Sequence, residues 1–86
     1  MKLNNLEFTA LCKVARKTNC DCWFCLVRDK KNDYVWDIEN NKKITIKQAL
    51  LEMEDAIIDP LENYGLTHEE INAINNIYHN IKYNKI

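Results

Sequence analysis

Apolar residues recur every three or four positions between residues 4 and 18, and basic residues fall between them. This period predicts an amphipathic helix with one buried side. We expect that side to contain Phe8, Leu11, Cys12 and Ala15. Basic residues gather in the last turns, where they complement the negative end of the helix dipole. Asn19 should end the helix, because asparagine tolerates a left-handed backbone.

Two apolar stretches separated by a polar turn predict a β-hairpin. Residues 22–28 (CWFCLVR) lack clear alternation, which is typical of a strand covered on both faces or at one end. After the polar residues 29–33, the stretch 34–38 places Tyr34, Trp36 and Ile38 on one face. We interpret the aromatic residues of the hairpin as core residues. A second polar turn follows at 39–43, after which Ile44 should either extend the sheet or dock onto the next helix.

Two capping boxes mark the starts of two further helices. In residues 45–48 (TIKQ) and 67–70 (THEE), we expect the threonine hydroxyl to accept from the amide of the fourth residue, whose side chain reaches back. Pro60 should end the first of these helices and open a single turn that Gly65 terminates. The predicted inward residues are Ile46, Ala49, Leu50, Met53 and Ile57 in the first helix, and Ile71, Ile74, Ile77 or Tyr78, and Ile81 in the second.

The predicted order of elements is α-β-β-α-α. Residues 1–86 would then form one small α+β domain with a two- or three-stranded antiparallel sheet packed against helices. Of the 86 residues, 47% are hydrophobic and 29% are charged, as in packed soluble proteins. No apolar stretch approaches the ~20 residues that span a bilayer, and the N-terminus lacks the apolar core of a signal peptide. We therefore predict a cytoplasmic protein with no membrane partner.

The four cysteines are the strongest candidates for site chemistry. Cys12, Cys20, Cys22 and Cys25 offer four thiolates, which is a ligand set for zinc. However, structural zinc sites usually pair their ligands on two separated turns, and a strand at 22–28 would send Cys22 and Cys25 to opposite faces. We therefore predict buried structural cysteines and no cofactor, with Cys20 more reactive than Cys25. A zinc- or thiol-dependent module built on the four cysteines is the alternative.

The chain offers little else for catalysis. It contains no serine, and its two histidines, His68 and His79, should lie about 16 Å apart along one helix. We predict that the protein is not an enzyme. Asn, Lys and Ile dominate the sequence, which is typical of AT-rich bacterial genomes and their phages. A small domain with an acidic segment from such a source fits a phage or mobile-element inhibitor.

The hairpin combines aromatic and basic residues, as nucleic-acid-binding surfaces do. The aromatic residues are Trp23, Phe24, Tyr34 and Trp36, and the cations are Arg28, Lys30, Lys31, Lys42 and Lys43. Four acidic residues lie among them and should cancel much of the field: Asp29, Asp33, Asp37 and Glu39. We therefore predict that nucleic acid is not the partner, and we keep weak nucleic-acid binding through the hairpin as an alternative.

Charge is divided unevenly along the chain. Residues 1–49 carry ten cations and six anions, a balance of +4, whereas residues 50–86 carry two and seven, a balance of −5. An acidic surface attracts basic partners and repels phosphates. We therefore predict a protein-binding protein whose partner has a basic surface. The expected contacts are Glu52, Glu54, Asp55, Asp59, Glu62, Tyr64, Glu69 and Glu70, with the apolar neighbours Leu51, Ile58 and Leu61.

A purely structural explanation of the acidic segment competes with this hypothesis. Acidic side chains favour helix starts, because the helix dipole is positive there. Asp59, Glu62, Glu69 and Glu70 are all expected at such starts. The sequence alone leaves both explanations open.

Overall fold

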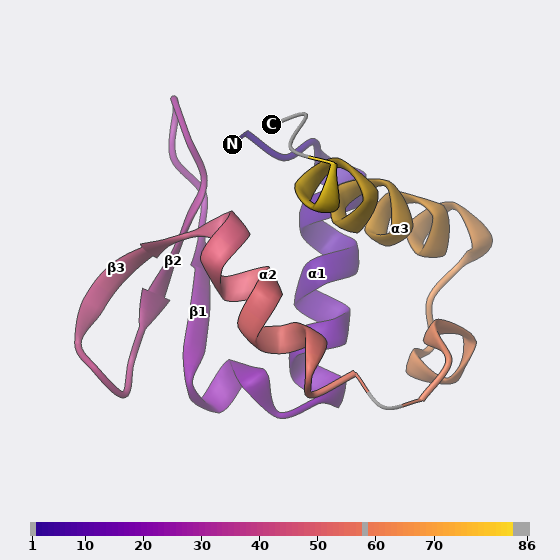
Figure 1. Cartoon of the computed structure of the whole chain (residues 1–86), viewed down its shortest axis with the longest axis horizontal. Coiled ribbons are helices and arrows are strands. Elements are labelled where there is room, and N and C mark those ends of the chain that lie inside the picture. The colour runs from indigo at the N-terminus through magenta and orange to yellow at the C-terminus, as the bar shows by residue number, and fades with distance from the viewer. Residues whose placement is uncertain (1, 58, 84–86) are drawn as a thin grey trace.

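One helix, three strands and two further helices follow one another along the chain, in a computed structural model that describes residues 2–57 and 59–83 (Figure 1). Short 3₁₀ turns precede the first strand and the last helix. The elements are α1 (Asn5–Lys17), η1 (Cys20–Cys22), β1 (Phe24–Val27), β2 (Tyr34–Asp37), β3 (Lys42–Thr45), α2 (Ile46–Glu54), η2 (Leu61–Tyr64) and α3 (His68–Lys82). The predicted small α+β fold is confirmed, and its sheet has three strands.

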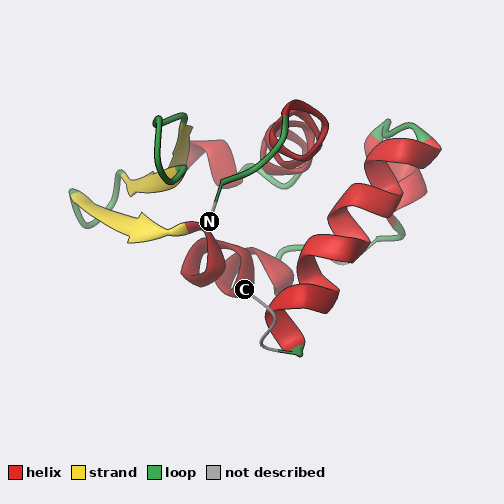
Figure 2. Ribbon diagram, turned by 90° about the horizontal axis from the view of Figure 1, so that it is seen from above, coloured by secondary structure: helices red, strands yellow, loops and turns green. Residues whose placement is uncertain are grey.

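The strands form an antiparallel sheet in the order β1-β2-β3. In the central strand, Val35 lies between Leu26 of β1 and Ile44 of β3, and this apolar row faces the helices. Ile44 is 5% exposed and belongs to β3, so it extends the sheet as one of the two predictions had it. Figure 2 shows the helices on one side of the sheet. The opposite face, which we call the outer face, is left uncovered by the described elements.

The core fills the space between the inner sheet face, α1 and α2, and continues between α1 and α3. The buried apolar residues of the helices are Ala10, Leu11, Val14, Ala15, Ile46, Ala49, Leu50, Met53, Ala73, Ile74, Ile77 and Ile81. The predicted inward residues are among them, except for Phe8, Cys12, Ile57, Ile71 and Tyr78, which are half-buried. The periodicity of the sequence therefore located the core sides of all three helices.

Side-chain caps fix where the helices begin. Asn4 and Glu7 form a complete capping box at α1, and Thr67 and Glu70 form another at α3. At α2, the Gln48 amide donates to the Thr45 hydroxyl at 3.1 Å. Each cap satisfies amide groups that would otherwise lack a partner in the first helical turn. The capping box of α3 is confirmed, and that of α1 was missed. At α2 the Thr45 cap is confirmed, but the predicted return bond from the Gln48 side chain is not among its contacts.

The start of β1 differs from the prediction. Asn19 ends α1 in a left-handed conformation, with φ 62°, as expected. Residues 20–22 then form η1, in which the Trp23 amide donates to the Cys20 carbonyl at 2.9 Å. β1 therefore begins at Phe24, not at Cys22. A single 3₁₀ turn has no repeat that apolar periodicity could reveal.

The end of α2 also differs from the prediction. The helix ends at Glu54, and the amides of Ala56 and Ile57 bond to carbonyls three residues back. Its last turn and cap carry Glu52, Glu54 and Asp55, and the last turn contains no basic residue. Because the C-terminal end of a helix dipole is negative, these carboxylates disfavour extension of α2 by another turn. The apolar period had extended the helix to Pro60. The predicted single turn after Pro60 is confirmed as η2, which Pro60 caps and Gly65 ends in a left-handed conformation.

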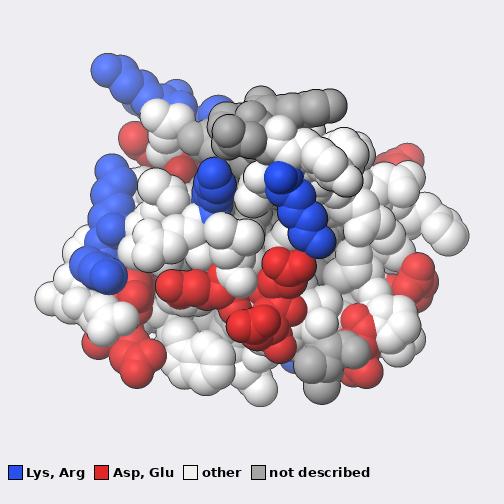
Figure 3. All heavy atoms as spheres, in the orientation of Figure 1, with Lys and Arg blue, Asp and Glu red and all other residues white. Residues whose placement is uncertain are grey.

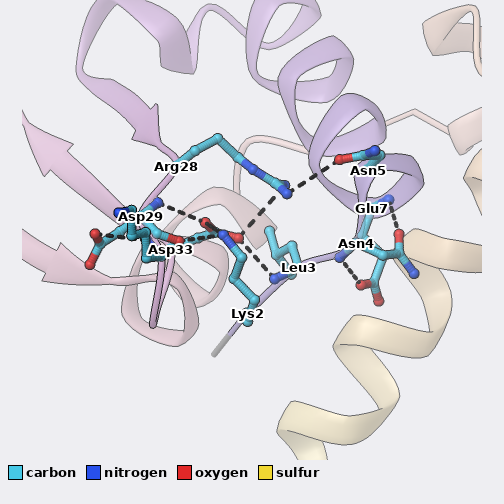
Figure 4. A network of polar contacts seen from close by, with 9 residues as sticks. Lys2, Leu3, Asn4, Asn5, Glu7, Arg28, Asp29 and Asp33 are labelled. Carbon is cyan, nitrogen blue, oxygen red and sulfur yellow. Dashed lines mark hydrogen bonds and ion pairs between the residues drawn. The ribbon is translucent and has the colours of Figure 1, made fainter.

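A polar network joins the start of the chain to the turn between β1 and β2 (Figure 4). The buried Asp33 carboxylate accepts from the Leu3 amide at 2.8 Å and from the Asp29 amide at 3.1 Å. Its cationic partners are Lys2 at 3.0 Å and Arg28 at 3.7 Å. Burial opposes ionisation, but these hydrogen bonds and cations lower the pKa of Asp33 below its usual value. The network holds the hairpin turn against the chain that leads into α1.

Candidate functional site

Six acidic residues of the predicted contact surface are exposed, and we call them the acidic surface: Glu52, Glu54, Asp55, Asp59, Glu62 and Glu69. They lie on the C-terminal end of α2 and along the chain from there to the first turn of α3. Figure 3 shows acidic side chains gathering over α2. The surface is therefore contributed by consecutive segments that the fold keeps on the outside.

Two predicted contact residues do not belong to this surface. Glu70 is 4% exposed, and its carboxylate accepts from the Lys13 ammonium and from the Thr67 amide, both at 2.9 Å. The Thr67 and Lys13 hydrogen bonds lower the pKa of Glu70 against the opposing effect of burial. Tyr64 is 7% exposed and packs at the end of η2. Both positions are corrected to structural ones, and Ile58 lies outside the described residues.

The acidic side chains of α2 are placed where their own helix disfavours them. Glu52, Glu54 and Asp55 occupy its C-terminal end, which carries the negative pole of the helix dipole. The ammonium group of Lys82 lies 3.4 Å from the Glu54 carboxylate, in an exposed ion pair. Exposed pairs of this kind contribute little to stability. The preference of acidic side chains for helix N-termini accounts for Glu69 and Glu70 in the first turn of α3. It does not account for the three carboxylates at the C-terminal end of α2.

A hollow of about 300 Å³ lies beside the acidic surface, between α2, η2 and α3. Its apolar wall consists of Ile57, Leu61, Ile74 and the ring of Tyr78, with Asn75, Glu54 and Lys82 also lining it. The Tyr78 hydroxyl donates to the Leu50 carbonyl at 3.1 Å. Burial, and then the nearby Glu54 carboxylate, raise the pKa of Tyr78 above its usual range, so this hydroxyl remains a donor.

Basic residues bound the acidic surface on the α1 side of η2. Arg16 and Lys17, in the last turn of α1, line a second hollow of about 220 Å³ with Tyr64 and Gly65. Lys13 also lines it and is engaged by Glu70. The acidic surface is therefore confined to the side of the molecule formed by α2, η2 and the start of α3.

The four cysteines differ in their exposure to solvent. Cys20 is buried at 1% exposure, Cys12 is half-buried, and Cys22 and Cys25 are exposed. Within residues 2–57 and 59–83, no group of three potential metal-ligating side chains is found. Burial raises the pKa of the Cys12 thiol, and Arg16 and Arg28 oppose that rise only in part. The prediction of buried cysteines is therefore confirmed for Cys20 and wrong for Cys22 and Cys25. Because Cys20 belongs to the core and Cys25 is exposed, we now expect Cys25 to be the more reactive of the two.

The aromatic residues of the hairpin divide between the two faces of the sheet. Phe24 is buried, as predicted, whereas Trp36 is 38% exposed on the outer face and Trp23 is 49% exposed. Ile38 is 48% exposed, and its amide donates to the Trp23 carbonyl at 2.8 Å, one step beyond the paired strands. The interpretation of both tryptophans as core residues was wrong, because the inner face is formed by Leu26, Val35 and Ile44.

Comparisons of this chain with protein families, with curated proteins and with solved structures give no significant match. None of the helices within the described residues is both long and apolar enough to cross a membrane. We therefore infer function from the surfaces of the molecule.

Proposed function

We propose that this protein is a non-enzymatic binding protein that engages another protein with a basic surface through the acidic surface. The observation that carries the proposal is the placement of Glu52, Glu54 and Asp55 at the wrong end of α2 for helix stability. Residues that oppose the stability of their own element are expected where function requires them. Opposite charges would guide the partner into place and speed its association.

The neighbouring hollow gives this surface an anchor point. Strong protein contacts usually combine an apolar side chain in a pocket with a polar rim. Here the apolar wall of Ile57, Leu61 and Ile74 lies next to the Glu54 carboxylate. A partner segment with one apolar side chain among lysines or arginines would fit this arrangement. An inhibitor that covers the basic surface of its target is the role that follows most directly.

Neutralising two carboxylates of α2 should separate binding from folding. We expect the double variant E52Q/D55N to capture its partner about tenfold less well than the unchanged protein from the cells that produce it. The same variant should unfold at a slightly higher temperature, by about 2 °C, because the helix dipole no longer opposes two charges. Quantitative mass spectrometry of the captured proteins and thermal unfolding provide the two measurements.

A matched control removes the same number of charges elsewhere. D29N/E39Q neutralises two exposed residues of the sheet turns and retains an oxygen on residue 29 that can accept from the Lys30 amide. This variant should capture the same proteins as the unchanged chain. Equal capture by E52Q/D55N and the unchanged chain would rule out the acidic surface as the contact.

A further inference from the structure

The outer face of the sheet carries the exposed ring of Trp36 and the half-buried ring of Tyr34, and no described helix covers it (Figure 2). We propose that this face, together with the basic groove beside it, binds single-stranded nucleic acid. The proposal concerns a surface distinct from the acidic one and does not depend on it. The sequence predicted that nucleic acid is not the partner, because the aromatic residues were expected in the core and four acidic residues were expected to cancel the positive field. The structure exposes both tryptophans and buries two of those acidic residues.

The aromatic part of the site lies along β2, with Trp23 beside its end. Tyr34 and Trp36 alternate with Val35 along β2 and therefore share the outer face. Trp23 and Ile38 follow at the end of the same pair of strands, and both are about half exposed. Exposed aromatic rings on a sheet can stack successive bases of a single strand without reading their sequence, because every base has a π-face.

Cations lie beside these rings. Lys43 of β3 pairs with Trp36 across the sheet, and its ammonium group lies 4.4 Å from the centre of the Tyr34 ring. Lys31, Lys43 and Lys47 line a groove of about 780 Å³ between the β1–β2 turn, β3 and the start of α2, and Tyr34 lines it as well. The groove and the aromatic part of the site are therefore continuous. A basic groove next to stacking rings is the arrangement that follows the backbone of a single strand.

Two of the four acidic residues that weakened this hypothesis are buried. Asp33 also lines the groove, but its side chain is engaged by Lys2, Arg28 and the Leu3 amide. Asp37 is 4% exposed and accepts from the Asn40 amide at 3.1 Å and from its side chain at 2.8 Å. Asp29, which also lines the groove, and Glu39 remain exposed. Because Arg28 is paired with Asp33, the positive charge that would meet a phosphate rests on Lys31, Lys43 and Lys47 of the groove.

The acidic surface does not prevent this binding. In Figure 1 the sheet lies at one end of the long axis, and η2 and the first turn of α3, which carry Glu62 and Glu69, lie at the other. The end of α2 that carries Glu52, Glu54 and Asp55 lies between them, on the side of the sheet opposite to the outer face. Exposed charges are largely screened beyond about 8 Å at physiological ionic strength. A strand on the outer face would therefore interact mainly with the cations beside it.

The test titrates the protein with oligo(dT) and oligo(U) of about 12 nucleotides, a length that covers a site of this kind. The chain has two tryptophans, Trp23 and Trp36, and both are exposed near the start of β1. Stacking of bases on them should therefore quench the intrinsic fluorescence. We expect saturable quenching at about 50 mM salt, together with increased anisotropy of a labelled oligonucleotide. The affinity should fall steeply as salt is raised to about 300 mM.

Matched variants assign the binding to the outer face. Trp36→Ala should weaken binding about tenfold and Trp36→Phe much less, whereas Tyr83→Ala, at an exposed ring beyond α3, should have no effect. K43Q/K47Q should weaken binding and lower the slope of log affinity against log salt by about 1.4, because two phosphate contacts are lost. R16Q/K17Q removes two exposed cations of α1 and should leave the slope unchanged.

Three results would overturn the proposal. The first is the absence of quenching and of anisotropy change at about 100 µM protein in low salt. The second is equal binding by K43Q/K47Q and R16Q/K17Q, which would mean that binding follows overall charge only. The third is a dimer in sedimentation that Trp36→Ala dissociates and that binds no oligonucleotide, since the outer face would then contact a second copy of the chain.

Discussion

Replacing Leu11 with alanine is expected to lower the free energy of unfolding by about 3 kcal/mol or more. Leu11 is 1% exposed and lies where α1 meets the sheet and α2, in contact with a small apolar hollow lined also by Leu26, Val35 and Leu50. The shortened side chain would leave a cavity that these neighbours cannot fill without moving. Chemical denaturation followed by tryptophan fluorescence measures the loss.

The same substitution on the solvent side of α1 provides the control. Leu6 is 40% exposed, so Leu6→Ala should cost less than about 1 kcal/mol. A domain of this size is stabilised by only about 4 to 13 kcal/mol, which makes the loss at Leu11 a substantial share of the total. Equal losses in the two variants would contradict the placement of α1 against the sheet.

Removing the carboxylate of Asp33 is the second large effect. Asp33→Ala should lower the free energy of unfolding by about 2 to 4 kcal/mol, because the Leu3 amide loses a buried acceptor and Lys2 loses its partner. Glu39→Ala, at an exposed acidic position, should change it by less than about 0.5 kcal/mol. Losses of similar size in both variants would show that the network in Figure 4 does not stabilise the fold.

The depressed pKa of Asp33 gives the stability a definite pH dependence. A carboxylate with a lower pKa in the folded state stabilises the protein above its ordinary pKa of about 4. That stabilisation is lost as the pH falls through the lower folded value. The unchanged protein should therefore lose stability more steeply than Asp33→Asn below about pH 4. The pKa values of Asp37 and Glu70 are also lowered, so the variant should retain part of the dependence.

Local signals in the sequence predicted most of the fold. The helix periods and the Thr67–Glu70 pattern act within a few residues, and the structure follows them at α1 and α3. The Asn4–Glu7 pattern carries the same kind of signal and could have been recognised. The early end of α2 required the opposing charges of its last turn to be weighed against its apolar period.

The surfaces depended on contacts between distant parts of the chain. Glu70 was assigned to the acidic surface because its partner, Lys13, is 57 residues away in the sequence. Strand pairing also determines which face of the sheet is exposed. Alternation along β2 places Tyr34 and Trp36 on the same face, but it does not say whether that face is buried. The register places Lys43 beside Trp36 and Ile44 beside Val35, and a lysine is far costlier to bury than an isoleucine. That register could not be obtained from the sequence.

Site-specific photo-crosslinking from Leu51 tests the proposed function most directly. Leu51 is 45% exposed on α2 and lies one helical turn before Asp55, so a p-benzoylphenylalanine placed there faces the acidic surface without changing its charge. Leu6 on α1, at 40% exposure, provides the control position. In the producing cells we predict a crosslink from position 51 to a lysine- or arginine-rich segment of one protein, and none to that protein from position 6. Crosslinks to the same proteins from both positions, or none from position 51, would contradict a partner on the acidic surface.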